Sequence, residues 1–254
     1  MPEQQKLKSK YNIYQLSLIG HKDAPHLNPP ILTVEEREEL FADMQPHERL
    51  ARETGRPSLG AGAIYPVAED KLFIDPFRIP DHWEQGYALD PGWNVTAALL
   101  GARNPDTDQF YLTAEYYGQR DQPIIHAGGI KSMLPWRELE GCIDPAGDNV
   151  GSQKDGTKLK EEYEDQGLQL IKANNAVHAG LRHVLILMQQ GQLKIFNTLV
   201  YFLKELRLYR RDEKGKIVKA HDHLMDCCRY LLNTDSAFQP RPIQRSRSRS
   251  RGEW

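Results

Sequence analysis

The middle of the chain carries three short apolar runs separated by turn residues. The runs are Gly86–Asp90, Val95–Arg103 and Phe110–Tyr117, and each is of strand length and composition. Asn104–Asp108, between the second and third runs, holds the Asn, Pro and Asp residues typical of turns. The pattern therefore predicts an antiparallel three-strand meander.

Beyond the meander, helical and extended patterns alternate. Helices are predicted where apolar residues recur every three or four positions, and strands where apolar runs are short. The predicted elements are helix Pro123–Met133, strand Leu139–Asp144, helix Lys158–Asp165, strand Leu168–Ala173, helix Val177–Met188, strand Leu193–Phe196, helix Leu199–Leu206 and helix His221–Leu232. This order predicts an α/β fold with a mixed central sheet, in which parallel strands extend the meander and helices flank it.

The two ends of the chain lack a core pattern of their own. Residues 1–66 are rich in loop residues, and we expect them to be a connector that packs on another domain. Residues 67–233 hold the predicted sheet and helices. Residues 234–254 end in alternating Arg and Ser, which predicts a disordered tail.

Composition narrows the class of protein. The 254 residues are 39% hydrophobic and 27% charged, as in ordinary globular proteins, and no apolar run approaches the ~20 residues that span a bilayer. The three cysteines form no disulfide framework, which favours a reducing compartment. The net charge is −2 although five arginines lie after Gln239, so the body is acidic and unsuited to passive coating of nucleic acid.

Acidic residues stand at the ends of predicted elements. Asp90 ends the first strand of the meander, and Asp144 ends the next strand after the helical crossover. On the last helix, Asp222 and Asp226 are i, i+4 neighbours, and His223 and Asp226 are i, i+3 neighbours. Clustered carboxylates repel one another unless a cation neutralises them, and Mg²⁺ and Mn²⁺ prefer oxygen ligands. The alternative for Asp90 is a turn residue between two hairpin strands.

Two other kinds of site are not supported. Cys227 and Cys228 beside His221 and His223 suit tetrahedral zinc poorly, because adjacent helical residues point about 100° apart, so we expect the cysteines in the core. No Gly-x-x-x-x-Gly-Lys-Ser/Thr loop for nucleotide phosphates is present.

Three motifs together resemble the C-terminal nuclease domain of the large terminase subunit of tailed bacteriophages, a member of the RNase H/resolvase-like superfamily. They are Leu89–Gly92 on the first strand, Cys142–Ala146 on the fourth, and His221–Asp226 with Arg229 and Tyr230 on the last helix. Ala51–Pro66 resembles the segment that joins the packaging ATPase to its nuclease. The resemblance implies an RNase H-like fold and a metal-dependent endonuclease that cuts concatemeric viral double-stranded DNA during packaging, with the ATPase domain absent from this chain.

The resemblance also implies a site. Asp90 would bridge two divalent cations, Mg²⁺ or Mn²⁺, with Asp144 and Asp226 completing the ligands and His223 assisting. Asp222 is the alternative ligand to Asp226, since many terminases carry a double acid near this position; it could also bind a second ion or cap the helix. Two such ions can activate a water and stabilise the leaving oxygen of an in-line displacement.

Basic residues supply candidate DNA contacts. One group follows the second catalytic strand and the other shares a helix face; the residues are Lys154, Lys158, Lys160, Lys204, Arg207 and Arg211. The alternative is that these are solvated surface charges.

The resemblance implies double-stranded DNA, the packaging ATPase, the small terminase subunit and the portal as partners, no membrane, and the cytoplasm of an infected bacterium as location. Two other functions stay open, a non-catalytic docking module of a packaging motor and a junction-resolvase-type nuclease.

Overall fold

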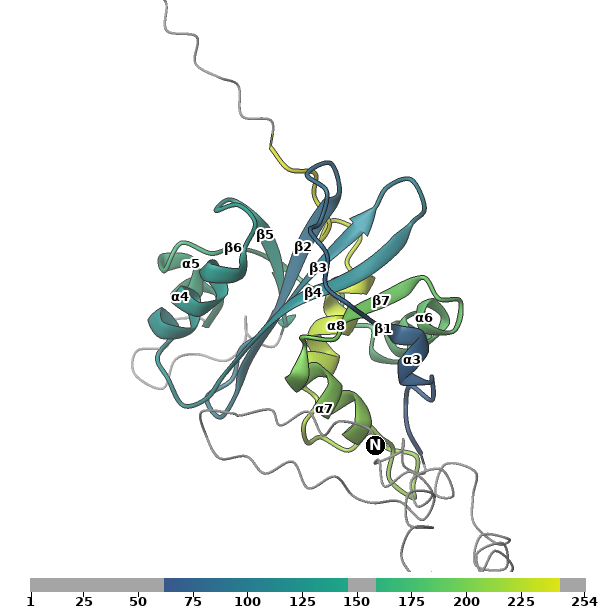
Figure 1. Ribbon diagram of the computed structural model, residues 1–254. Helices are drawn as coiled ribbons and strands as arrows, with labels where there is room; N and C mark the ends of the chain where they lie inside the picture. The colour runs from purple at the N-terminus through teal and green to yellow at the C-terminus, as the bar shows by residue number, and fades with distance from the viewer. Residues whose placement is uncertain (1–61, 146–158, 243–254) are drawn as a thin grey trace, which may run out of the picture. The chain divides into compact units, whose positions relative to one another are not determined.

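The computed structural model describes residues 62–145 and 159–242, which form a sheet with helices on both faces (Figure 1). The strands are β1 (Phe73–Ile74), β2 (Glu84–Asp90), β3 (Thr96–Asn104), β4 (Gln109–Gly118), β5 (Glu140–Ile143), β6 (Gln169–Lys172) and β7 (Leu193–Phe196). The helices are α3 (Glu69–Leu72), α4 (Pro123–Met133), α5 (Leu159–Asp165), α6 (Val177–Gln189), α7 (Val200–Leu208) and α8 (His223–Asn233). The predicted α/β class is confirmed.

The sheet is mixed. Its seven described strands lie in the order β1-β7-β4-β3-β2-β5-β6. β3 pairs antiparallel with both β2 and β4, and every other pairing is parallel. The meander and the added parallel strands are therefore as predicted. Because β2, β4 and β5 run in one direction, their carboxyl ends meet at the same edge of the sheet, the lower edge in Figure 1.

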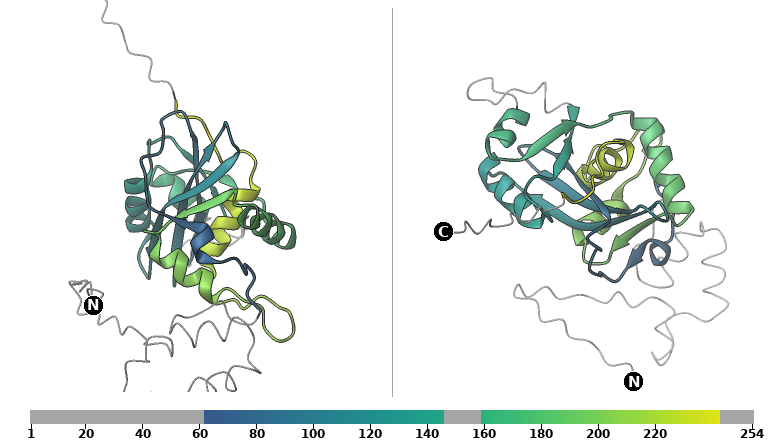
Figure 2. Two further views of the ribbon diagram at one scale, coloured as in Figure 1. Left: turned by 45° about the vertical axis from the view of Figure 1, so that its right-hand side comes forward. Right: turned by 90° about the horizontal axis from the view of Figure 1, so that it is seen from above.

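Each face of the sheet has its own core. In β2, Tyr87 and Leu89 pack with Ala127 and Ile130 of α4 in one cluster. Ala88 belongs to the second cluster, which includes the apolar residues of α6, α7 and α8. This alternation follows from the two-residue period of a strand. Viewed from above, α4 and α5 lie on one side of the sheet, with α6 and α8 on the other (Figure 2).

Element boundaries are close to those expected, with one instructive difference. The helix predicted over 123–133 has those bounds. The last helix was predicted from His221 but begins at His223. His221 has φ of +56° and Asp222 a φ of −120°, so neither residue has helical backbone angles. The chain turns sharply at these two residues before the helix starts.

The domain extends past both predicted boundaries. Ile64 and Tyr65 are buried, and the Ile64 N–H donates to the Tyr209 carbonyl. After α8, Ala237 is fully buried, and Gln239 exchanges backbone hydrogen bonds with Gln85. The boundary predicted at 233 is therefore too early, because the segment 234–242 packs along β2. Most of the predicted connector (1–61) and the Arg/Ser-rich end (243–254) lie outside the described residues.

Candidate active site

Asp90 occupies the last position of β2, at the edge where the parallel strands end. Strand alternation places it on the same face as Ala88, the face covered by α8. The side chain is only 16% exposed. A carboxylate so placed is held on a rigid strand yet remains reachable from the sheet edge.

Asp144 lies directly beside Asp90. The parallel register pairs Leu89 with Ile143, and the residue that follows each of them is an aspartate. The Asp144 N–H donates to the Leu89 carbonyl at 3.2 Å, which fixes the Asp144 backbone against β2. The two strand-end carboxylates predicted from sequence are thus neighbours in the fold.

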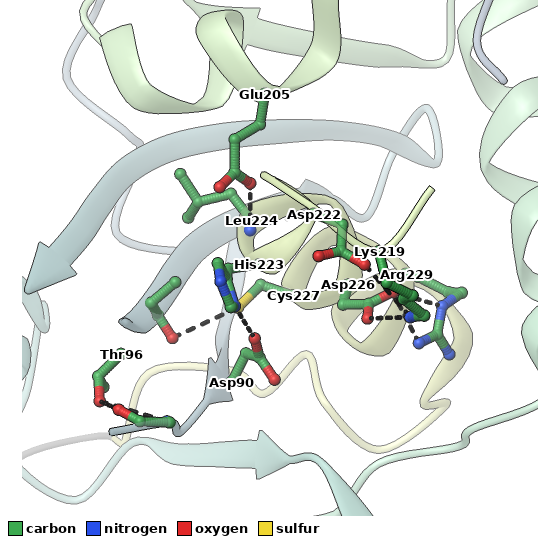
Figure 3. Close-up of polar contacts among 12 residues, drawn as sticks. Asp90, Thr96, Glu205, Lys219, Asp222, His223, Leu224, Asp226, Cys227 and Arg229 are labelled. Atoms are coloured by element: carbon green, nitrogen blue, oxygen red, sulfur yellow. Dashed lines mark hydrogen bonds and ion pairs between the residues drawn. The ribbon is translucent and has the colours of Figure 1, made fainter. Parts of the chain in front are cut away.

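His223 closes the site from α8. Its Nδ1 lies 2.8 Å from Oδ2 of Asp90 (Figure 3). The hydrogen bond to Asp90 raises the pKa of His223 despite its partial burial. Burial raises the pKa of Asp90, His223 opposes that effect, and the charges of Asp226 and Asp144 raise it further. The charges of two neighbouring carboxylates thus act on Asp90, while the imidazole of His223 contacts its carboxylate directly.

Asp226 is turned toward cations of its own chain. Its Oδ1 accepts from Arg229 Nη2 at 2.9 Å, and its Oδ2 lies 3.4 Å from Lys219 Nζ. The same Lys219 nitrogen lies 3.2 Å from the Asp222 carboxylate, so it bridges both acids of the helix start. Arg229 is 2% exposed and also donates to Asn175. Figure 3 shows Asp226 beside Lys219 and Arg229, with Asp90 beside His223.

The predicted site residues are therefore only partly brought together. Asp90, Asp144 and His223 adjoin, whereas Asp226 and Asp222 are neutralised by Lys219 and Arg229. In the described part of the chain, no three His, Cys, Asp or Glu side chains are already grouped to hold a metal ion. A cation at Oδ2 of Asp226 would compete with Lys219 for that oxygen.

Glu205 positions α8 and was not predicted. It is 2% exposed, and its Oε2 accepts the Leu224 N–H at 2.6 Å. Asp222 stands at the N-cap position but makes no side-chain cap bond, so Glu205 of α7 supplies the acceptor in its place. Burial raises the pKa of Glu205, and the bond from Leu224 opposes this. The available signal was a glutamate within the apolar face formed by Phe202 and Leu206.

The predicted DNA contacts have varied surroundings. Arg207 forms two bonds with Glu69, at 2.6 and 2.7 Å, and Arg211 donates to the Gly215 carbonyl. Lys160 lies 3.4 Å from Glu164, and Lys204 is exposed. Lys154 and Lys158 lie outside the described residues. Arg207 is thus held in an ion pair with Glu69. Lys204 is the most accessible of the four predicted DNA contacts that the structure describes.

The cysteines behave as core residues. Cys142, Cys227 and Cys228 are free and buried. Cys227 donates to the Ala97 carbonyl of β3, and Cys142 donates to the Tyr87 carbonyl of β2. The expectation that Cys227 and Cys228 lie in the core is confirmed.

None of the helices over 62–145 and 159–242 is long and apolar enough to cross a membrane.

Comparison with known proteins identifies the family. Residues 87–235 match the family described as "Terminase RNaseH-like domain", a span that contains Asp90, Asp144, Asp222, His223 and Asp226. The large terminase subunit of Salmonella phage P22 is 34% identical over 206 residues, which cover 78% of this chain. The chain belongs to the terminase RNaseH-like domain family. The large terminase subunit of Enterobacteria phage LP7 is also 34% identical over 206 residues.

Solved structures agree with this membership of the terminase family. The nuclease domain of the P22 large terminase has a TM-score of 0.64 at 30% identity, and the match covers 72% of this chain and 97% of that domain. The large terminase of a thermophilic bacteriophage shares the fold, with a TM-score of 0.57 at 19% identity over 80% of this chain and 52% of that one. The predicted RNase H-like fold is confirmed. This terminase domain spans 41–43% of the length of the two curated subunits.

Proposed function

We propose that the chain is a metal-dependent endonuclease that cuts concatemeric viral double-stranded DNA during genome packaging. Two facts support this proposal. The relatives at 34% identity are large terminase subunits, and the chain covers 97% of a domain named as the P22 large terminase nuclease. The proposed partners are DNA, a packaging ATPase domain, the small terminase subunit and the portal. The proposed location is the cytoplasm of an infected bacterium.

One observation carries the proposal. Two strand-end aspartates, Asp90 and Asp144, adjoin at the edge of the sheet, and His223 of α8 lies against the first of them. Adjacent carboxylates with little exposure are costly for stability, and the charge of Asp144 raises the pKa of Asp90. Such an arrangement is typical of a site that binds cations.

The donor set fits divalent Mg²⁺ or Mn²⁺. Asp90, Asp144 and Asp226 offer carboxylate oxygens, which these hard ions prefer, from two strands and a helix. Asp222 is a further oxygen ligand at the helix start, and we propose Asp226 as the main helix ligand because its charge acts on Asp90. When bound, two such ions would activate a water and stabilise the leaving oxygen of the phosphodiester.

The residues of the chain then have distinct tasks. Asp90 and Asp144 present their carboxylates from rigid backbone. His223 fixes the orientation of the Asp90 carboxylate through Nδ1. Glu205 fixes the start of α8, and therefore the height of His223 above the sheet, by accepting the Leu224 N–H. Lys219 and Arg229 balance the negative charge of Asp226.

A non-catalytic docking module is the second candidate, and one observation favours it. Asp226 already has a cation on each carboxylate oxygen, as a purely structural acid would. Cleavage of supercoiled plasmid with Mg²⁺, Mn²⁺ or EDTA separates the two functions. An endonuclease nicks the plasmid only with metal, and alanine variants of Asp90, Asp144 and Asp226 lose this activity. Asp222→Ala tests the alternative ligand. A docking module gives no nicking with either ion.

A further inference from the structure

Trp93 is unusual among the large apolar residues that the structure describes. Its side chain is 71% exposed, more than any other in that class. It lies in the loop between β2 and β3, three residues after Asp90. Consecutive Cα atoms are ~3.8 Å apart, so Trp93 lies within roughly 11 Å of Asp90. An exposed indole offers a flat apolar face and an N–H donor that a bound ligand can contact.

The loop that carries Trp93 is braced by hydrogen bonds at its base. Thr96, which is 1% exposed, accepts from the Gly92 N–H and donates to the Gly92 carbonyl, and its hydroxyl lies 3.3 Å from that of Tyr163. A Cβ at Gly92 would stand 2.7 Å from the Val95 carbonyl oxygen, so the tight turn requires glycine. The fold therefore presents the indole on a constrained loop.

Arg120 joins this loop from the other side of the meander. Its backbone N–H donates to the Trp93 carbonyl at 3.2 Å. It follows β4, whose carboxyl end shares the edge that carries Asp90. Within the described residues the Arg120 side chain is exposed and forms no hydrogen bond or ion pair. An exposed arginine and an exposed tryptophan are thus joined through their backbones near the strand ends that carry Asp90.

We propose that Trp93 and Arg120 form a contact surface for duplex DNA next to the scissile phosphate; this rests on the proposed endonuclease function. The Arg120 guanidinium pairs with a backbone phosphate, the commonest type of protein–DNA contact. The Trp93 indole packs on the sugar and base edges of a neighbouring nucleotide. Trp93 lies within roughly 11 Å of Asp90, which is about three base-pair steps of 3.4 Å. One duplex can therefore contact Trp93 while its scissile phosphate lies at Asp90.

Binding of a fluorescent 20-base-pair duplex tests the surface without cleavage. The measurements use the full chain carrying Asp90→Asn, at several salt concentrations. Added Trp93→Ala weakens binding at least fivefold, and Trp93→Phe restores most of it, with no change in the dependence on salt. Added Arg120→Gln lowers the slope of log affinity against log salt by about one, the loss of one phosphate contact.

Arg78→Gln is the matched control. Arg78 is 89% exposed and precedes β2, at the opposite end of the strand from Asp90, so its loss leaves the slope unchanged. Equal binding by Trp93→Ala, or an equal slope for Arg120→Gln and Arg78→Gln, overturns this surface while the endonuclease function stands. A chain that binds no duplex under any of these conditions overturns both.

Discussion

The imidazole of His223 meets the carboxylate of Asp90 across 133 residues of sequence, with Nδ1 and Oδ2 2.8 Å apart. This contact ties the start of α8 to the end of β2. It orients the carboxylate that the proposed function places at the centre of catalysis.

Removing His223 should lower nuclease activity without unfolding the domain. His223→Ala leaves the Asp90 carboxylate free to rotate, and loss of such an orienting partner typically costs about 10–100-fold in metal affinity or activity. Initial rates of plasmid nicking at several Mn²⁺ concentrations measure the loss. His178→Ala is the control, since this histidine is exposed on α6. Equal rates for the two variants would contradict an orienting role.

Glu205 should stabilise the fold through its bond to α8. Glu205→Ala leaves the Leu224 N–H without its acceptor, and loss of a helix cap costs about 0.5–2 kcal/mol in the free energy of unfolding. Glu205→Gln keeps an acceptor oxygen and should lose less. Urea denaturation of both variants gives the difference. If alanine and glutamine prove equally stable, the capping bond is not what Glu205 contributes.

Lys219 should compete with divalent cations for the helix acids. Its Nζ lies 3.2 and 3.4 Å from the carboxylates of Asp222 and Asp226. Lys219→Gln frees both, so Mn²⁺ should bind up to about fivefold more tightly, the range expected for an exposed ion pair. Calorimetric titration with Mn²⁺ measures this, with the exposed Lys214→Gln as control. Weaker or unchanged binding in Lys219→Gln relative to the control would show that Lys219 is not a counter-ion to the site.

Stability should fall at acidic pH through His126. This histidine is 1% exposed, and its Nδ1 lies 2.9 Å from the Tyr116 hydroxyl. Burial lowers the pKa of His126. The unfolded chain therefore binds the proton more readily, and the stabilisation present above about pH 6.5 is lost as the pH falls below that value.

A comparison of variants isolates this histidine. The unfolding free energy of the wild type should drop between pH 7.5 and 5.5 by more than that of His126→Gln, which cannot titrate. The exposed His82→Gln should follow the wild type. Parallel curves for wild type and His126→Gln would assign the acid sensitivity to other groups.

The regular helices and strands could be predicted from sequence because their apolar residues recur at regular spacing. The meander and α4 appear at or near their predicted positions, and Asp90 and Asp144 were recognisable as strand ends. The parallel pairing of β1 with β7 was not predicted, because β1 is two residues long and carries no periodic signal. The end of the domain was missed for a related reason, since a polar segment near Gln239 packs through backbone bonds.

The site was harder to predict than the fold. Helical spacing placed Asp222, His223 and Asp226 together, but it could not decide which of them faces Asp90. The structure gives that position to His223, while Asp226 pairs with Arg229 three residues further on. Such choices depend on rotamers and on buried cations from other turns, neither of which has a signature in sequence.

Plasmid cleavage by Asp90→Asn is the most direct test of the proposed function. The substitution keeps the size of the side chain and removes the charge that would hold the metal. Supercoiled plasmid is incubated with Mg²⁺ or Mn²⁺, and Asp106→Asn in the exposed β3–β4 turn is the control. We predict that the wild type and Asp106→Asn nick the plasmid only with metal, and that Asp90→Asn, with an unchanged melting temperature, does not. Undiminished nicking by Asp90→Asn would contradict the assignment of this site.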